Sequence, residues 1–438
     1  MERGAEAAQK PGLGLVSELN LYYLLVALYF LAFGMQFVLF PSLVAFNLDA
    51  TPAGVGLAQS ALSAPMFCLL LFGGLLAERA RPSTTIALLY LGFAFTTLIL
   101  CAVVAAGQLT YSFLITYAVI VGSCAAFAMP VRDAALNGIV AREAELGKHT
   151  PIATAAAVTT AVQIGAQIAG ILIAQFAGRS PAPYLAIQAL ALALGAAVAL
   201  TMQAPKPSGH ERTLQGALRD LKEGLVYSFR DPVMSPMLIS AAYVGVFVIG
   251  AFQVLFPLII RDAYGGDNHT QGLRLGALLA CFWSASFVSA VVLSRLKPLR
   301  QPGRSLIASH LIGAAALFSF GFHKPFLLFA FIVVLWGFAA GIAISTSRTI
   351  VQGAAGQRYL GRVLAVYSMG FMGGAPVGSA LVGFAAGEFG PRAASFAPAI
   401  GLAIASLALA LFTPLWRYAP APATAAEPLE TDLETETR

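Results

Sequence analysis

Long apolar stretches fill nearly the whole chain, and they constrain its fold more than any other feature. Twelve of them are long and apolar enough to cross a bilayer as helices. Only 11% of the 438 residues are charged, against about 25% in a soluble domain. A water-soluble enzyme is therefore excluded. We expect an all-α membrane protein with transmembrane helices at residues 19–42, 52–76, 83–106, 111–131, 151–177, 182–203, 234–260, 271–293, 305–321, 325–346, 363–386 and 394–416.

The cations are distributed unevenly between the two ends of these helices. With the N-terminus inside, only five of the 26 Lys and Arg residues lie in outer connections, and the other 21 lie on the inner side. The outer cations are Arg179, Arg261, Arg274, Lys324 and Arg392. This asymmetry follows the positive-inside rule and predicts that both termini are cytoplasmic. The net charge of +6 is thus explained by the cations on the inner side of the membrane. The chain has no solvated basic domain that could bind nucleic acid.

The four cysteines all lie within expected helices, at spacings that indicate neither a disulfide framework nor a metal site. They are Cys68, Cys101, Cys124 and Cys281. We expect no cofactor and no metal.

The two halves of the chain resemble each other at a shift of 216 residues. The shift superimposes residues 38–41 on residues 254–257, both reading VLFP, and it also aligns three pairs of arginines. The pairs are Arg79 with Arg295, Arg132 with Arg348, and Arg142 with Arg358. The repeat predicts six duplicated helices, with an N-terminal half at residues 1–203 and a C-terminal half at residues 234–418.

Residues 204–233 link the halves. Between Leu214 and Phe229, apolar residues recur at three- and four-residue steps and charged residues occupy the other side, the pattern of an amphipathic helix. A helix on the membrane surface and a solvated linker helix both fit. Residues 419–438 are rich in Pro and Ala and then acidic, which predicts a disordered tail.

Three segments resemble motifs of the major facilitator superfamily. Residues 73–81 (GGLLAERAR) are similar to its signature loop between the second and third helices, written G-x-L-A-D-R-x-G-R-R. Residues 130–143 (PVRDAALNGIVARE) and 360–378 (LGRVLAVYSMGFMGGAPVG) resemble its enterobactin-exporter and macrolide-efflux branch. The resemblance implies two six-helix halves and alternating access. It also implies export of a small amphipathic molecule, such as a siderophore or a drug, across a bacterial inner membrane.

One departure from the family pattern keeps a second function open. Residues 165–170 (GAQIAG) carry alanine where exporters of this superfamily carry proline. The alternative is an importer, or a flippase, of a native metabolite or lysolipid. No arrangement of residues in the chain indicates an enzyme.

Polar and aromatic side chains inside the apolar helices are the candidate substrate-binding residues, because such groups are costly in a membrane unless they face an interior or water. Three of them share one face of the fifth helix, and two glutamines lie in the repeated segments. Any one of them could instead simply join helices. The candidates are Tyr29, Phe33, Gln36, Tyr117, Thr160, Gln163, Gln167, Tyr243, Gln253, Trp336 and Tyr367.

Charged residues at the inner helix ends are candidates for a conformational lock that shuts the cytoplasmic side while the cavity faces outward. In the alternative interpretation, the arginines among them only satisfy the positive-inside rule. The candidates are Glu78, Arg79, Arg132 and Asp133 in the first half, with Arg295 and Arg348 in the second.

Acidic residues are missing from the middle of the expected helices, which limits how protons could drive a carrier. Asp133 is the first candidate if protons are the coupling ion. His310 lies at mid-depth, and a packed histidine is its simpler interpretation. The expected partners are a small-molecule substrate and the lipid bilayer, and we expect a monomer.

Overall fold

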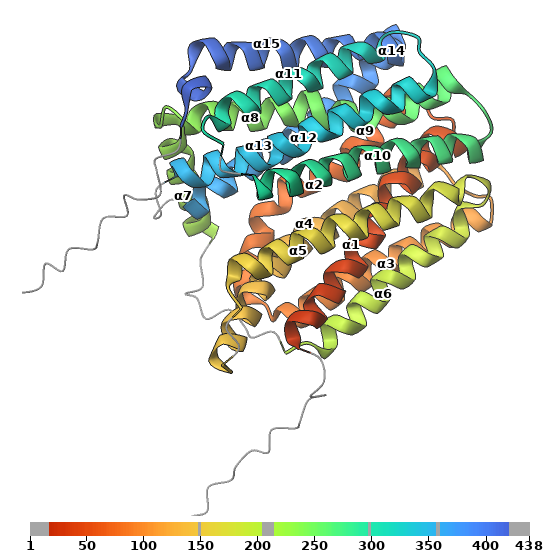
Figure 1. The fold of residues 1–438 in the computed structure, drawn as a ribbon. Helices are drawn as coiled ribbons and strands as arrows, with labels where there is room; N and C mark the ends of the chain where they lie inside the picture. Colours follow the sequence, from red (N-terminus) through yellow and green to blue (C-terminus); the bar gives the residue numbers. More distant parts are fainter. Residues whose placement is uncertain (1–16, 148–149, 204–213, 297–298, 356–359, 420–438) are drawn as a thin grey trace, which may run out of the picture.

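The computed structural model describes residues 17–147, 150–203, 214–296, 299–355 and 360–419. These residues form helices and no strand. Twelve helical spans are long and apolar enough to cross a membrane, and they lie side by side as two groups (Figure 1). Eleven are continuous, and the twelfth consists of Pro52–Leu69 and Phe72–Arg79, which meet at 54°. The expected all-α architecture of twelve helices is confirmed.

The N-terminal group contains the first six spans. They are α1 (Glu18–Ser42) continued by η1 (Leu43–Asn47), α2 (Pro52–Arg79), α3 (Pro82–Ala105), α4 (Tyr111–Glu145), α5 (Ile152–Ala174) continued by η2 (Gln175–Arg179), and α6 (Pro181–Thr201). We call the end of the molecule at which α1 begins the near end, and the opposite end the far end.

The C-terminal group contains the other six spans and ends in a short 3₁₀ turn. The seventh span is built from α8 (Met234–Val244), η3 (Gly245–Ile249), α9 (Gly250–Ile259) and η4 (Ile260–Tyr264). The rest are α10 (Asn268–Arg295), α11 (Pro302–Phe320), α12 (Phe326–Ala354), α13 (Leu360–Phe389), and α14 (Pro391–Ala394) with α15 (Phe396–Phe412), followed by η5 (Pro414–Arg417).

A further helix, α7 (Leu214–Arg230), lies at the near end (Figure 1). Arg362 at the start of α13 forms ion pairs with Asp220 and Glu223 of α7, each at 2.7 Å. After α7, the Asp231 carboxylate accepts hydrogen bonds from the backbone N–H groups that open α8. Residues 204–213 of the expected linker, and residues 420–438 of the expected tail, lie outside the described residues.

Two spans continue well beyond the apolar stretches that predict them. α4 runs to Glu145 rather than ending near residue 131, and α12 runs to Ala354 rather than ending near residue 346. Hydropathy marks where residues stop being apolar, whereas backbone hydrogen bonds carry a helix on through charged residues. Arg132 and Asp133 consequently lie inside α4 and not in a loop.

Glycines let several helices touch at the backbone. A Cβ on Gly378 of α13 would lie 2.1 Å from the carbonyl oxygen of Val246, and one on Gly337 of α12 would lie 2.4 Å from that of Phe282. No larger residue fits such contacts, which are typical of packed transmembrane helices.

The two groups meet through α2 against α13 and through α5 and η2 against α10. At the far end Gly56 of α2 faces Gly383 of α13, where an added Cβ would lie 2.8 Å from the Cα of Gly383. Gly178 of η2 similarly approaches the backbone of Asn268. The far ends of the two groups are therefore in direct contact.

Candidate functional site

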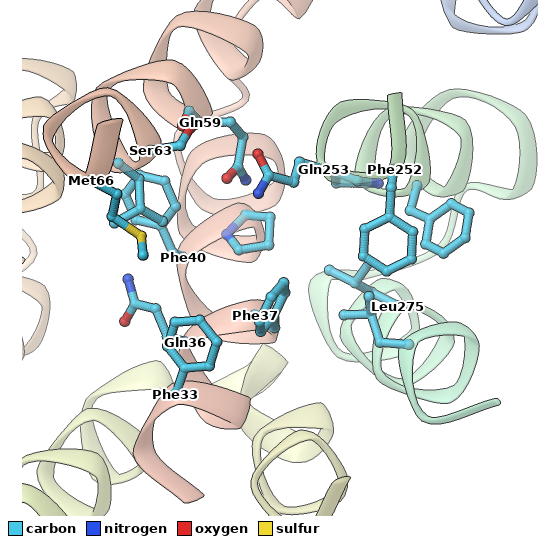
Figure 2. A pocket seen from close by; sticks show the side chains of 15 residues that line it. Phe33, Gln36, Phe37, Phe40, Gln59, Ser63, Met66, Phe252, Gln253 and Leu275 are labelled. Atoms are coloured by element: carbon cyan, nitrogen blue, oxygen red, sulfur yellow. Dashed lines mark hydrogen bonds between the residues drawn. The ribbon is translucent and has the colours of Figure 1, made fainter. Parts of the chain in front are cut away.

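A cavity of about 90 Å³ lies between the two groups, bordered by α1 and α2 on one side and by α9 and α10 on the other (Figure 2). The helices bring together aromatic rings, two prolines and three glutamines. The lining residues are Phe33, Gln36, Phe37, Phe40, Pro41, Gln59, Leu62, Ser63, Met66, Phe252, Gln253, Phe256, Pro257, Leu275 and Leu279.

Most of the lining residues fall into pairs related by the 216-residue shift. The cavity therefore lies where the repeated segments of the two halves face each other. The pairs are Gln36 with Phe252, Phe37 with Gln253, Phe40 with Phe256, Pro41 with Pro257, Gln59 with Leu275, and Ser63 with Leu279.

Buried hydrogen bonds fix the orientation of the Gln36 amide. Gln188 Nε2 donates to the carbonyl oxygen of Ala32 at 3.2 Å and to Gln36 Oε1 at 2.8 Å. Tyr117 donates to the same Oε1 at 2.8 Å. Because Oε1 already accepts two hydrogen bonds, the amide turns its donor, Nε2, to a side without a partner among the described residues. Gln36 thus offers a pre-oriented donor at the cavity wall.

The other two glutamines lie across the cavity from each other. Gln59 extends from α2 and Gln253 from α9, and their amides point toward one another (Figure 2). Ser379 of α13 donates to Gln253 Oε1 at 3.2 Å, which restricts this side chain as well. Amides can both donate and accept, so these groups suit a ligand with mixed hydrogen-bonding groups.

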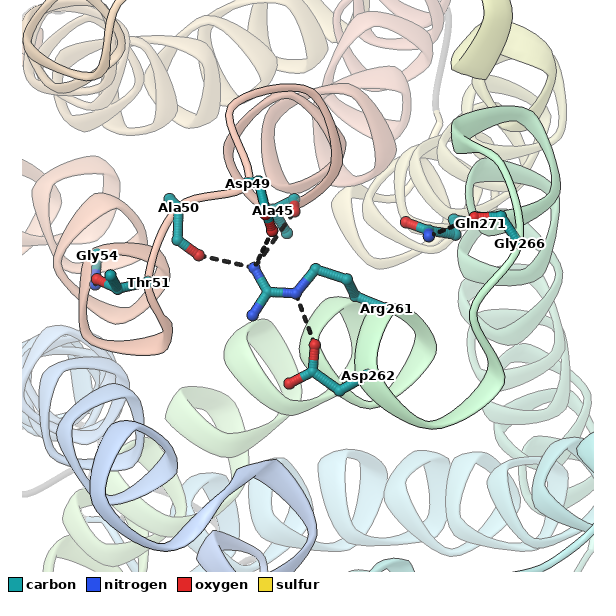
Figure 3. A network of polar contacts seen from close by, with 9 residues as sticks. All are labelled: Ala45, Asp49, Ala50, Thr51, Gly54, Arg261, Asp262, Gly266 and Gln271. Carbon is teal, nitrogen blue, oxygen red and sulfur yellow. Dashed lines mark hydrogen bonds and ion pairs between the residues drawn. The ribbon is translucent and has the colours of Figure 1, made fainter.

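Arg261 lies one turn beyond Pro257 of the cavity lining, and its polar contacts are shown in Figure 3. It belongs to η4 of the C-terminal half, and its Nη1 donates to the carbonyl oxygen of Ala50 at 2.7 Å and to Asp49 at 3.2 Å in the N-terminal half. A longer contact of 3.4 Å reaches the carbonyl oxygen of Ala45. Its Nε donates to Asp262 at 2.7 Å. One side chain therefore ties both halves together.

Arg261 is a contact between the halves that the sequence patterns above do not select as a candidate. A signal for it is present in the sequence, because it is one of the few cations that the positive-inside rule assigns to the outer side and it follows the repeated VLFP segment closely. A second tie lies nearby, where Ser60 of α2 donates to the carbonyl oxygen of Pro376 of α13 at 2.6 Å. The contacts of Arg261 join the halves at the far end, and the Ser60 contact joins them at the level of the cavity, one residue from Gln59.

Three of the predicted cavity residues line the cavity, namely Phe33, Gln36 and Gln253. The other aromatic candidates lie inside the halves, where they pack between helices. Trp336, for example, lies within 6.0 Å of the rings of Phe252 and Phe256, measured between centroids. The candidates away from the cavity lining are Tyr29, Tyr117, Thr160, Gln163, Gln167, Tyr243, Trp336 and Tyr367.

The polar face of α5 divides along its length. Thr160 is exposed and donates to the carbonyl oxygen of Ala156 in its own helix at 3.0 Å. Gln163 is half-buried. Gln167 is buried against α1, where its backbone oxygen would lie 2.0 Å from a Cβ on Gly34. Only the far part of this face is thus held in a helix contact.

Two of the lock candidates, Arg132 and Asp133, lie together on α4, and Arg348 approaches them from α12 of the other half. The charge of Asp133 interacts with the charges of both arginines. Arg132 is 1% exposed, and its guanidinium lies 5.2 Å from the ring centroid of Tyr29 and 4.8 Å from that of Phe30. Its Nε and Nη1 have no hydrogen-bond partner among the described residues.

The remaining lock candidates lie at helix ends. Glu78 and Arg79 end α2, and Glu78 borders a surface hollow together with Asp220 and Arg362. Arg295 is the exposed last residue of α10. The structure thus separates the candidates into one group on α4 and α12 and another at the ends of α2 and α10.

A second buried polar network lies within the C-terminal half. Tyr243 of α8 lies 2.7 Å from His310 Nδ1 of α11 and 3.4 Å from Ser406 of α15, measured at its hydroxyl. His310 is therefore a packed and hydrogen-bonded histidine. Within the described part of the chain, no three His, Cys, Asp or Glu residues are grouped so that they could hold a metal ion.

The sequence matches the model of the Major Facilitator Superfamily over residues 22–370. Similar curated proteins include the enterobactin exporter EntS of Citrobacter koseri, 25% identical over 365 residues, which are 82% of each chain. The enterobactin exporter EntS of Escherichia coli O81 is 24% identical over 366 residues, again 82% of each chain.

Solved structures with the same fold include transporters of different kinds. A bacterial homolog of the human lysosomal transporter Spinster, inward-facing and unoccupied, matches with a TM-score of 0.68 at 14% identity, over 92% of this chain and 98% of that one. A D-xylose-proton symporter matches with a TM-score of 0.66 at 14% identity, over 92% of this chain and 98% of that one. At these identities the likeness shows the fold alone. Because the family model spans most of the sequence, the chain belongs to the Major Facilitator Superfamily.

Proposed function

We propose that this transporter exports a small amphipathic molecule by alternating access. The cavity between the halves carries the proposal, because one wall offers the polar groups of Gln36, Gln59 and Ser63 while the other is mainly apolar. Such a site accommodates a molecule with one polar and one apolar side. Members of this family are transporters, and enzymatic activity is not part of the proposal.

The substrate class follows from the wall chemistry and from the relatives. Two curated relatives are named as exporters of enterobactin, so a siderophore or a drug of similar character is the proposed cargo. The cavity of about 90 Å³ is smaller than the roughly 300–1,000 Å³ of typical ligand pockets. The halves must therefore separate to admit such a molecule.

The positive-inside distribution of cations supports placing the near end in the cytoplasm. The contacts of Arg261 then close the cavity on the outer side of a bacterial inner membrane. Export requires these contacts to break while contacts at the near end form. We also propose that the chain acts as a monomer, with halves at residues 1–203 and 234–418 joined by residues 204–233.

The proposed near-end lock consists of Glu78, Arg79, Arg132 and Asp133 with their counterparts Arg295 and Arg348. The approach of Arg348 to Asp133 across the halves supports it. Replacement Glu78→Gln should strongly reduce transport while membrane insertion stays normal, since a neutral amide forms a weaker pair. Transport close to that of the unmodified chain would mean that the arginines serve topology only.

Asp133 is also the proposed proton-binding group, because it is an exposed carboxylate inside the span α4. If protons drive export, an uncoupler should abolish it, and Asp133→Asn should do the same without the uncoupler. Export that continues in both cases would remove protons as the coupling ion.

Direction is tested in membrane vesicles. Purified inside-out vesicles should accumulate a fluorescent siderophore or dye, and an uncoupler should collapse the gradient if protons are the coupling ion. Uptake into right-side-out vesicles would favour the alternative, an importer. If a lysolipid moves between the leaflets while no dye accumulates in the vesicles, the result would favour a flippase. These alternatives are tested because residues 165–170 carry alanine where exporters of this superfamily carry proline.

A further inference from the structure

A groove lies on the outer surface of the C-terminal half, between α11 and α15, which run side by side (Figure 1). It has a volume of about 730 Å³, and it shares no residue with the central cavity. Most of its wall is apolar, whereas one end is aromatic and cationic. Its main lining residues are Leu311, Leu407, Leu411, Phe412, Trp416 and Arg417.

Tight packing fixes the end of the groove formed by η5. A Cβ on Gly303 of α11 would lie 1.8 Å from the carbonyl oxygen of Leu415, so the two backbones touch there. Leu415 is fully buried. The hydroxyl of Thr413 accepts a hydrogen bond from the Leu415 N–H at 3.3 Å and so caps the turn. This packing holds Trp416 and Arg417 in place at the mouth of the groove.

Two arginines give this end of the groove its positive charge. The guanidinium of Arg304 lies 5.4 Å from the ring centroid of Trp416, and Arg417 lines the groove directly. Neither forms an ion pair with a carboxylate within the described residues. Arginine recognises phosphate groups well, and tryptophan and arginine are typical of the headgroup level of a bilayer.

The dimensions fit one leaflet. Along α15 the groove runs from Leu407 to Phe412, about 8 Å at the helical rise per residue, which lies within one half of a hydrocarbon core about 30 Å thick. Because Trp416 and Arg417 follow the end of α15, we place the cationic end of the groove at the headgroup level and its apolar part at the depth of the acyl chains.

We propose that an anionic phospholipid occupies this groove, with its phosphate on Arg304 and Arg417 and one acyl chain between α11 and α15. Because the groove is separate from the central cavity, the site does not depend on the proposed direction of transport. The occupant is a lipid rather than a free phosphate, since most of the groove wall is apolar.

Native mass spectrometry of the full chain tests this. The protein in detergent is given equal amounts of phosphatidylglycerol and phosphatidylcholine with identical acyl chains. The unmodified chain should retain more phosphatidylglycerol. The double variant Arg304→Gln/Arg417→Gln should lower the preference for phosphatidylglycerol by about 30-fold, because each basic residue contributes about 1 kcal/mol toward anionic lipid. Retention unchanged by the double variant overturns the proposal.

Three controls distinguish a lipid in the groove from a general effect of charge and from a bound free phosphate. Arg81→Gln/Arg230→Gln removes the same charge from exposed positions elsewhere at the near end and should leave the preference intact. Ala410→Phe fills the groove without changing charge and should lower the retention of both lipids. Glycerol phosphate should not compete; if it displaces the lipid fully, the arginines bind a free phosphate and the lipid proposal fails.

Discussion

The two walls of the central cavity occupy equivalent positions in the repeat but differ in polarity. Where the N-terminal half places Gln36, Gln59 and Ser63, the C-terminal half places Phe252, Leu275 and Leu279. In one pair the polarity is reversed, because the N-terminal half has Phe37 where the C-terminal half has Gln253. The repeat thus supplies the same backbone frame twice, and the side chains make the cavity two-sided.

This difference assigns separate tasks to the two halves. In the N-terminal wall the Gln36 amide is held by Tyr117 and Gln188, so its hydrogen-bonding direction is set before a ligand arrives. In the C-terminal wall the ring of Phe252 packs on Phe256 and Phe282, with centroids 4.9 and 4.7 Å away. We expect the polar side of a substrate to face the N-terminal half.

The largest effect is expected for Gln36→Leu, which makes the polar wall resemble the apolar one. It removes the oriented donor and leaves Tyr117 and Gln188 without their shared acceptor. A buried polar group left without its hydrogen bond costs about 1–3 kcal/mol, so transport should fall by about 5- to 150-fold. Initial rates in vesicles, normalised to the inserted protein, measure this.

Tyr117→Phe is the matched control for that experiment. It deletes one of the two hydrogen bonds to Gln36 Oε1 but keeps the amide at the wall. The loss of transport should be clearly smaller than for Gln36→Leu. Equal losses would show that the network only supports the helix packing of the N-terminal half.

Arg261 marks another difference between the halves, because the shift aligns it with Ala45, whose carbonyl oxygen it contacts. Arg261→Gln should weaken the far-end closure, since charged hydrogen bonds are worth about 1.5–3 kcal/mol each. A cysteine introduced at Ser63 should then react roughly tenfold faster with a membrane-impermeant reagent added outside.

Asp49→Asn tests which contacts of Arg261 matter. The Asp49 side chain is 84% exposed, and exposed ion pairs contribute little. Its effect on labelling should therefore be small, because the hydrogen bond from Arg261 to the Ala50 carbonyl oxygen remains. An effect as large as that of Arg261→Gln would assign the closure to the ion pair instead.

Sequence patterns predict the twelve helices. For the position of the cavity, however, the only signal in the sequence is the internal repeat. Gln36 and Gln253 attract attention as polar residues in apolar helices, whereas Leu275 and Phe256 look like any lipid-facing residue. The shift that aligns Gln59 with Leu275 is the one sequence signal that marks these positions. Helical periodicity cannot separate a residue facing the cavity from one such as Trp336, because both lie on interior faces of a helix. Only tertiary packing divides them.

A smaller effect is expected when the apolar wall is made polar. Leu275→Gln introduces at that position the residue found at its counterpart, Gln59, and removes apolar contact area of the C-terminal wall. For an amphipathic dye, the apparent KM should rise by about three- to tenfold. A leucine that is fully buried by a ligand contributes about 1.5–3 kcal/mol to binding, and a dye in the cavity covers only part of this side chain. Leu275→Met keeps the area and should change little.

The smallest effect is expected at the helix caps, where the halves differ in chemistry at equivalent positions. Thr51 caps α2, and Asp267, 216 residues later, caps α10. The Thr270 hydroxyl and N–H donate to the Asp267 carboxylate and hold its pKa below its usual range. The charged cap therefore stabilises α10 fully above the unfolded-state pKa of about 3.9 and loses this contribution as pH falls through the lower folded-state pKa.

Replacing Asp267 by threonine gives both halves the same uncharged cap and so tests this difference directly. At pH 7 the variant Asp267→Thr should melt slightly lower than the unmodified chain, by no more than about 1–2 °C, and the gap should close as the pH is lowered past about 4. The reverse variant Thr51→Asp should acquire the opposite dependence, with a gain at pH 7 that disappears in acid. Thermal melting of both variants in the same detergent, from pH 7 to pH 3, measures this. A gap for Asp267→Thr that stays constant across this range would mean that the two caps differ in packing and not in charge.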